Sequence, residues 1–279
     1  MNKDQYHHLL RSEFGYQTPP GQKVSSNFFP GWLNFIYYLR LMSTLTHAGI
    51  LGRRGELDDE KWAWFSHRIV QIAESVGGKV NISGLEALSH QPGPLVYIAN
   101  HMSLLEAFIL PGIALAFNRI TFVIKEELRH YPVFKHIMIA LKLIAVSRQN
   151  PRDDLKTVLR EGSKFISNGG SIIIFPQATR SVEFDVEGFN TLGVKLASRN
   201  GVPVVPVAIK TDFQHNGKWI KDMGPIDPHK TLYFKFGEPL DVVGNGRQTH
   251  QHVIDFIAQN LLAWGGRIKG NSASSLSEL

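Results

Sequence analysis

Residues 95–106 read LVYIANHMSLLE, and this stretch decides the fold. The apolar run 95–99 predicts a strand that is buried on both faces. The polar pair Asn100-His101 follows it, and residues 104–117 then form an apolar segment of helical length. A buried strand that passes through a short polar turn into a helix is the first half of a βαβ unit. The stretch therefore predicts an α/β fold with parallel strands.

The same alternation continues along most of the chain. Apolar, β-branched runs predict strands at 79–83, 94–99, 120–124, 143–146, 171–175, 202–209 and 231–236. Segments of helical length occupy 104–117, 133–141, 152–167, 191–198 and 250–264. We therefore expect one α/β domain over residues 79–264, with a mostly parallel or mixed sheet of about seven strands flanked by helices.

Three further segments are expected outside this domain. Residues 1–27 are polar and predict a flexible arm, and the Gly/Ser-rich residues 265–279 predict a flexible tail. Residues 28–78 begin with aromatic and aliphatic side chains beside basic ones, which is typical of a helix that lies in the membrane interface. The alternative is a helix that covers the edge of the core. We expect a helical, membrane-interfacial segment over residues 28–78.

Composition excludes several kinds of site. The 279 residues include no cysteine, which rules out disulfides, zinc thiolates, iron–sulfur clusters and a cysteine nucleophile. The 43% of hydrophobic residues is too high for a disordered chain. The formal charge of +6 suggests an anionic partner, either nucleic acid, a lipid headgroup or a phosphorylated substrate. Nucleic acid is disfavoured, because the basic residues are spread along the chain instead of gathered in one cluster.

The sequence also lacks familiar nucleotide and hydrolase motifs. There is no Gly-x-Ser-x-Gly, no Gly-x-Gly-x-x-Gly and no Walker A loop, so a serine hydrolase, a dinucleotide site and an NTP site are unsupported. The pairs His7-His8 and His250-x-His252 have no metal-ligand partners nearby in sequence, and we interpret them as surface histidines. No metal site and no bound cofactor are expected.

One pair of residues stands out by its context. Three histidines have an acid five positions later, His8, His101 and His250, where about one is expected by chance, so spacing alone decides nothing. His101 differs because it follows a buried strand and precedes a helix, at the strand end where open α/β sheets bind ligands. There its ring can turn toward Glu106, which would fix the tautomer of a general base. The alternative is a structural histidine at a helix start.

A second strand end has similar character. The apolar run 171–175 leads into the segment PQATRS at 176–181, which delivers Arg180 to the same edge of the sheet. The planar guanidinium group binds phosphate through two hydrogen bonds, and hydroxyl groups add further donors. The alternative is an ordinary loop arginine.

Four segments in order resemble the lysophospholipid acyltransferase family, which includes the 1-acylglycerol-3-phosphate acyltransferases. They are NHMSLLE at 100–106, KEELRHYP at 125–132, FPQATRS at 175–181 and VPV at 205–207, and Arg148 matches an arginine that follows the next strand in the family. The resemblance in the order of elements extends over residues 79–264.

The resemblance implies transfer of an acyl chain from acyl-CoA or acyl carrier protein to the hydroxyl of a lysolipid. His101 would be the general base and Glu106 would orient it, with no metal or cofactor. The residues implied to bind substrate are Lys125, Glu127, Arg148, Gln177, Thr179, Arg180 and Ser181. Asn100, Pro176 and Pro206 would support the site. The family also implies a peripheral or monotopic position on the cytoplasmic face of a membrane.

Three positions depart from the family pattern. Glu106 replaces Asp, Gln177 replaces Glu, and Ala178 replaces Gly. The last two lie in the motif that binds the acceptor, so a headgroup other than that of lysophosphatidic acid is a possible acceptor. The alternatives are a catalytically weak lipid-binding relative and a hydrolase of acyl thioesters or lysolipids.

Overall fold

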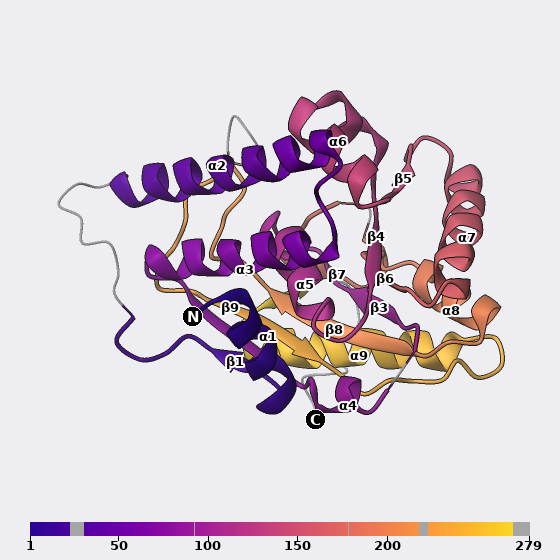
Figure 1. Cartoon of the computed structure of the whole chain (residues 1–279). Helices are drawn as coiled ribbons and strands as arrows, with labels where there is room; N and C mark the ends of the chain where they lie inside the picture. Colours follow the sequence, from indigo (N-terminus) through magenta and orange to yellow (C-terminus); the bar gives the residue numbers. More distant parts are fainter. Residues whose placement is uncertain (23–30, 92, 178, 218–222, 270–279) are drawn as a thin grey trace.

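A computed structural model describes residues 1–22, 31–91, 93–177, 179–217 and 223–269. Within these ranges, eight strands form one sheet (Figure 1). In spatial order they are β1 (Tyr16–Gln17), β2 (Lys79–Ser83), β9 (Thr231–Phe236), β8 (Val204–Lys210), β3 (Val96–Ala99), β6 (Ser171–Ile174), β4 (Ile120–Lys125) and β5 (Ile144–Val146). The five strands from β8 to β5 are parallel, and β9 and β1 each run antiparallel to one neighbour, so the sheet is mixed.

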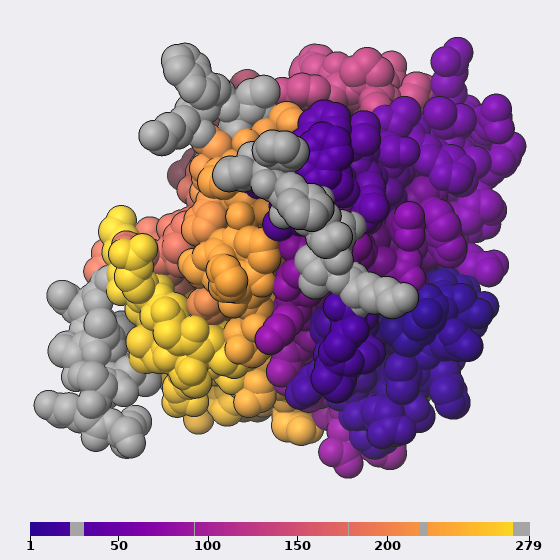
Figure 2. Space-filling view, turned by 90° about the vertical axis from the view of Figure 1, so that its left-hand side faces the viewer, coloured from indigo at the N-terminus to yellow at the C-terminus, as the bar shows by residue number. Residues whose placement is uncertain are grey.

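Helices cover both faces of the sheet, and each face has its own apolar core. One core includes buried side chains of α1 (Lys3–Ser12), α2 (Trp32–Arg54), α3 (Asp59–Ser75), α5 (Leu105–Ala114) and α6 (Pro132–Ala140). The other includes those of α7 (Pro151–Ser167), α8 (Leu192–Asn200) and α9 (Arg247–Ala263). The short helices are α4 (Glu86–Ser89) and η1 (Glu126–His130). In Figure 2 the N-terminal elements, indigo to purple, form one flank, and the orange and yellow C-terminal part forms the other.

Strand register brings the polar turns together. β3 lies between β6 and β8, with Ile98 opposite both Ile174 and Pro206 in parallel ladders. The segments that follow these three strands, beginning at residues 100, 175 and 211, therefore leave the sheet at the same edge. All seven residues of β8 are buried, as expected for a strand covered on both faces. The register thus places His101 beside the 175–181 segment and the end of β8.

Local sequence explains the boundaries of several helices that flank the sheet. The side chain of Asn150 caps α7 by accepting from the backbone N–H of Arg152, and Pro151 fits the first helical position. α8 ends at Gly201, whose φ of +60° suits glycine. α5 begins without a side-chain cap at its N-cap residue, Leu104. Glu106, in the first turn of α5, reaches back to accept backbone N–H groups instead.

The strand and helix predictions for residues 79–264 are confirmed, and the α/β class with them. The flexible arm expected over residues 1–27 is wrong for its described part. Tyr6 and Leu10 of α1 are buried, and β1 pairs with β2. The expected flexible tail is also wrong at its start, because β10 (Arg267–Lys269) pairs with β7 (Glu183–Asp185). Residues 23–27 and 270–279 lie outside the described residues.

Residues 31–78 are mainly helical, as expected, and α2 packs tightly on α6. A Cβ atom at Gly52 would lie 2.8 Å from the carbonyl oxygen of His136, and one at Gly49 would lie 3.0 Å from a methyl carbon of Val133. Only glycine allows the two backbones this close approach. Within the described ranges, none of the helices combines the length and the apolar character needed to cross a membrane.

Candidate active site

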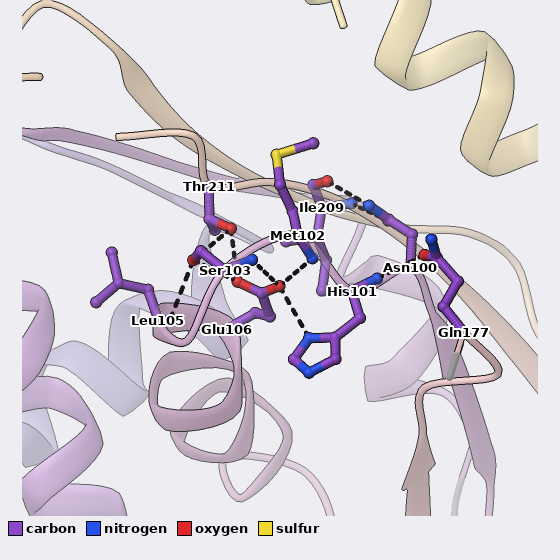
Figure 3. A network of polar contacts seen from close by, with 9 residues as sticks. All are labelled: Asn100, His101, Met102, Ser103, Leu105, Glu106, Gln177, Ile209 and Thr211. Carbon is purple, nitrogen blue, oxygen red and sulfur yellow. Dashed lines mark hydrogen bonds and ion pairs between the residues drawn. The ribbon is translucent and has the colours of Figure 1, made fainter. Parts of the chain in front are cut away.

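His101 and Glu106 form a hydrogen-bonded pair between β3 and α5 (Figure 3). His101 Nδ1 lies 3.1 Å from Glu106 Oε1, and the side chain of His101 is 15% exposed. Because the carboxylate is an acceptor, Nδ1 carries the proton in this contact, which leaves Nε2 as the basic nitrogen. Figure 3 shows the rest of the ring directed away from Glu106. The contact holds the imidazole in one tautomer, with Nε2 free of this hydrogen bond.

Glu106 is fully buried and accepts five hydrogen bonds. Its Oε1 atom receives the backbone N–H groups of Met102 and Ser103 as well as His101. Its Oε2 atom receives the hydroxyl groups of Ser103, at 2.7 Å, and Thr211, at 2.5 Å. Burial alone would raise the pKa of this carboxyl group, but the contacts with His101, Thr211 and Ser103 outweigh burial and place its pKa below the usual value. Glu106 is therefore an anion beside the ring of His101.

Two members of this network, Ser103 and Thr211, were missed in the sequence. Ser103 lies inside the recognised segment, and its hydroxyl also contacts Thr211 Oγ1 at 2.9 Å. Thr211 directly follows β8, and it lies at the same edge of the sheet as His101, which follows β3. The same rule, applied to the Val-Pro-Val strand, would have found it. Both hydroxyl groups fix the carboxylate and do not contact the ring of His101.

Asn100 and Gln177 hold the backbone around His101. The amide group of Asn100 makes two hydrogen bonds with the backbone of Ile209, at 2.7 and 2.8 Å, which tie the end of β3 to β8. Gln177 Oε1 accepts the backbone N–H of His101 at 2.8 Å. In addition, the backbone N–H of Ser181 donates to the carbonyl oxygen of His101 at 3.0 Å. Asn100 therefore fixes the end of β3, and Gln177 and Ser181 hold the backbone of His101.

Two prolines and an aromatic ring complete the surroundings of His101. Pro176 is buried, and its carbonyl oxygen accepts from the amide group of Asn190. Pro206 lies in β8 opposite Ile98, and Ile98 is three residues before His101 in the sequence. Phe175 was not expected to take part. Its ring stacks on the imidazole with centroids 4.5 Å apart and an interplanar angle of 24°, which restricts the plane of the base.

Three of the expected cations share one cavity with His101. Lys125, Arg148 and Arg180 all line it, although they come from three separate segments of the chain. Lys125 Nζ also pairs with Glu127 Oε2 at 2.5 Å. The pKa of Arg148 lies below its usual value, chiefly through desolvation and also through the charge of Arg180.

The remaining predicted positions lie differently. Thr179 is exposed and is not part of the cavity lining. The hydroxyl group of Ser181 accepts from the backbone N–H of Glu183 at 3.2 Å, so it is engaged in the local turn. Ala178 lies outside the described residues. Among the residues with described placement, no cluster of three or more His, Cys, Asp or Glu is arranged to hold a metal ion.

The cavity itself is mostly apolar and has a volume of about 240 Å³. It lies on the face of the sheet covered by α2, α3, α5 and α6. Its wall includes Leu45 of α2, Phe65 of α3, Phe108 of α5 and Met138 of α6. His101 and the three cations give it a polar end, and the apolar part extends between the helices. The site can therefore hold a long apolar chain next to a base and an anionic group.

Comparison with known proteins agrees with this geometry. Residues 79–210 match the family model described as Acyltransferase. A 1-acyl-sn-glycerol-3-phosphate acyltransferase of Pseudomonas aeruginosa is 29% identical over 168 residues, 60% of this chain and 63% of that protein. A chloroplastic enzyme of the same name from Arabidopsis thaliana is 28% identical over 149 residues, 52% of this chain and 41% of that protein. The chain thus spans less than two thirds of the length of these relatives.

A solved structure shares the fold. The 1-acyl-sn-glycerophosphate acyltransferase of Thermotoga maritima superimposes with a TM-score of 0.59 and 23% identity, over 86% of this chain and 97% of that one. The residues that match the family model include His101, Glu106, Lys125, the segment 175–181 and strand β8. Residues 79–210 of this chain are therefore similar to the acyltransferase family.

Proposed function

We propose that this chain is an O-acyltransferase that moves a fatty acyl chain from a thioester to the hydroxyl group of a lysolipid. The thioester is carried by CoA or by acyl carrier protein. The acceptor is 1-acyl-sn-glycerol-3-phosphate, as in the names of the relatives, or a related lysolipid. One observation carries the proposal: His101, oriented by Glu106, lines an apolar cavity together with Lys125, Arg148 and Arg180.

The chemistry follows from the orientation of the imidazole. Nε2 of His101 accepts the proton of the acceptor hydroxyl group while its oxygen attacks the thioester carbonyl carbon. Collapse of the tetrahedral intermediate breaks the carbon–sulfur bond, and the departing sulfur takes the proton from Nε2. The products are an ester and a free thiol, and His101 is neutral again. Glu106 stabilises the transient imidazolium, as the carboxylate does in a Ser-His-Asp triad. The absence of cysteine suits this direct attack, without an acyl-cysteine intermediate.

The three cations suit a phosphorylated headgroup, because guanidinium and ammonium groups bind phosphate through charge-assisted hydrogen bonds. Gln177 makes its hydrogen bond to His101 without adding a negative charge, so it is compatible with an anionic acceptor. The apolar part of the cavity is suited to an acyl chain, since each buried methylene contributes about 0.8 kcal/mol.

The outer side of α2 supports contact with a membrane. Trp32, Phe35, Leu39 and Met42 occupy one side of this helix and are 39–57% exposed. Arg53 and Arg54 follow in its last turn, where they can meet anionic headgroups. α2 lies at the outside of the molecule in Figure 1, and its inner side lines the cavity. We therefore propose a peripheral or monotopic protein at the cytoplasmic face of a membrane, with α2 in the lipid interface.

The test is an acyl-transfer assay with a panel of lysolipids and both donors, acyl-CoA and acyl carrier protein. His101→Ala is expected to abolish transfer without loss of folding or vesicle binding. The matched control His8→Ala replaces an exposed histidine of α1 and is expected to leave transfer unchanged. Transfer that survives His101→Ala would contradict the assignment of the base. Thioester consumption without any acceptor product would favour a hydrolase, and lysolipid binding without turnover would favour a lipid-binding relative.

A further inference from the structure

A second cavity lies on the opposite side of the sheet edge, below α7 and α8. It has a volume of about 420 Å³, which is within the range of roughly 300–1,000 Å³ found for small-molecule sites. Its wall is formed by the ends of β4, β5 and β6 and by the first turns of α7 and α8. The lining includes Leu155 of α7 and both Leu192 and Lys195 of α8. None of these three lines the first cavity.

The two cavities share part of their lining next to His101, which itself lines the first cavity. Val123, Arg148 and Phe175 line both of them. The ring of Phe175 stacks on the imidazole, and Gln177, in the wall of the second cavity, accepts the backbone N–H of His101. The second cavity therefore lies directly behind the ring of Phe175 that stacks on His101.

The wall of the second cavity combines apolar surface with positive charge. Asp154 is engaged locally: its carboxylate oxygens accept the backbone N–H groups of Ser147 and Arg148, at 2.9 and 2.8 Å. Asn190 is engaged likewise, with Pro176 and with the backbone N–H of Leu192. Lys195 is exposed at the outer rim. A ligand with a flexible, partly apolar body and an anionic end matches this wall.

The surroundings distinguish this cavity from the first. The first is bordered by α2 and α6, which carry exposed apolar side chains such as Phe35 and Ile139. The second is bordered by α7 and α8, whose exposed positions at this end include Arg152 and Lys195. The first therefore opens near the side that suits lipid, and the second opens near a basic surface that suits a water-soluble anion.

We propose that the second cavity binds the 4′-phosphopantetheine arm of the acyl donor, the group that CoA and acyl carrier protein share. The inference rests on the proposed acyl transfer. The acyl chain occupies the first cavity, the thioester carbonyl lies at His101, and the sulfur lies beside Phe175. The amide-containing arm follows the wall formed by Leu155 and Leu192, and its phosphate lies near Lys195. The lysolipid approaches from the side of α2 and α6.

The test compares three variants of the whole chain. Leu192→Trp narrows the second cavity, and Lys195→Glu reverses the charge at its rim. Arg199→Glu is the matched control, because Arg199 is an exposed cation of the same helix that does not line the cavity. Circular dichroism and the thermal midpoint check that each variant folds. Acyl-CoA, acyl carrier protein and the truncated donor acyl-N-acetylcysteamine, which lacks the phosphate, serve as substrates.

Lys195→Glu is expected to raise KM for acyl-CoA and acyl carrier protein by about fivefold, the ratio for a rim ion pair of about 1 kcal/mol. It should not affect the truncated donor. Leu192→Trp should raise KM for both carrier-linked donors, and neither variant should change KM for the lysolipid. Arg199→Glu should change none of these constants. An effect restricted to acyl-CoA, or to acyl carrier protein, would show which carrier reaches the site.

Unchanged donor KM in both Leu192→Trp and Lys195→Glu would overturn the inference while leaving acyl transfer standing. A rise in lysolipid KM instead would assign the cavity to the acceptor. Calorimetric titration with CoA alone tests the proposed donor site separately from the proposed acyl transfer, because it needs no turnover. If the wild type transfers no acyl group but binds CoA in a way that Lys195→Glu weakens, the cavity assignment stands and the proposed function fails. If the wild type neither transfers an acyl group nor binds CoA, the proposed function and the cavity assignment are both refuted.

Discussion

Glu106→Asp introduces the residue that the family pattern has at this position, yet we expect it to impair this protein. Removal of one methylene retracts the carboxylate by roughly the length of one carbon–carbon bond, about 1.5 Å. The contact between His101 Nδ1 and Glu106 Oε1 is 3.1 Å, so it would lengthen well beyond hydrogen-bond range unless α5 moved. Positioning errors of about 1 Å can reduce rates by about 10²-fold. We expect kcat to fall by one to two orders of magnitude.

The same substitution should also destabilise the fold. The hydroxyl groups of Thr211 and Ser103 lie 2.5 and 2.7 Å from Oε2 and are buried with it. A buried polar group left without its partner costs about 1–3 kcal/mol. We expect the free energy of unfolding to fall by an amount in this range, measured by urea denaturation.

Two comparison variants separate length from charge. Glu106→Gln keeps the length of the side chain but removes the charge that stabilises imidazolium, so kcat should fall with little change in acceptor KM. Glu161→Asp makes the same shortening at a side chain of α7 that is 43% exposed and should change neither activity nor stability. The reasoning would be refuted if Glu106→Asp matched or exceeded the wild type in acyl transfer.

The other predictions concern the headgroup, the membrane and pH. Arg180→Ala should mainly raise the acceptor KM in the transfer assay, since headgroup binding contributes in both ground and transition states; a rise confined to the donor KM would assign Arg180 to the donor. Removal of residues 1–51 would expose the core that Leu41 of α2 helps to form, so point changes test the membrane contact better. Phe35→Ser, at a side chain that is 57% exposed, should weaken vesicle binding in a flotation assay by about fivefold, from about 1 kcal/mol of lost apolar burial; undiminished flotation would exclude this surface. The pKa of Glu106 is lower in the folded state, so its contribution to stability is present above the unfolded pKa and is lost as pH falls through the folded pKa. Acid titration of the unfolding free energy should therefore show a smaller loss in Glu106→Gln than in the wild type, and identical acid sensitivity would contradict this.

The sequence was sufficient to predict the elements that are determined by residues close together in the chain. The seven apolar runs are strands because each carries enough β-branched and apolar residues to be buried, as β8 shows. His101 and Glu106 could be paired because they lie five residues apart on either side of a helix start. Arg180 could be placed at the same sheet edge because it follows a parallel strand.

Features that depend on contacts between residues far apart in the sequence could not be predicted from local patterns. α1 is polar overall, and its two buried apolar residues, Tyr6 and Leu10, find their partners only when the N-terminal helices pack. Thr211 is an ordinary threonine until β8 lies beside β3. The stacking of Phe175 on His101 depends on the register between β3 and β6. None of these contacts has a periodicity or a motif within its own segment.

The hydrogen bonds that steady the His–Glu pair have a consequence for the order of events during synthesis. His101 and Glu106 leave the ribosome almost together, but Thr211 is 105 residues farther along than Glu106, and Ile209 is 109 residues beyond Asn100. A nascent chain that ends before β8 contains His101 and Glu106 but lacks the Thr211 hydroxyl group and the Ile209 backbone groups that help to fix them. The complete hydrogen-bond network is therefore formed late in translation, when β8 pairs with β3. Thioester turnover by stalled chains of increasing length would date that pairing.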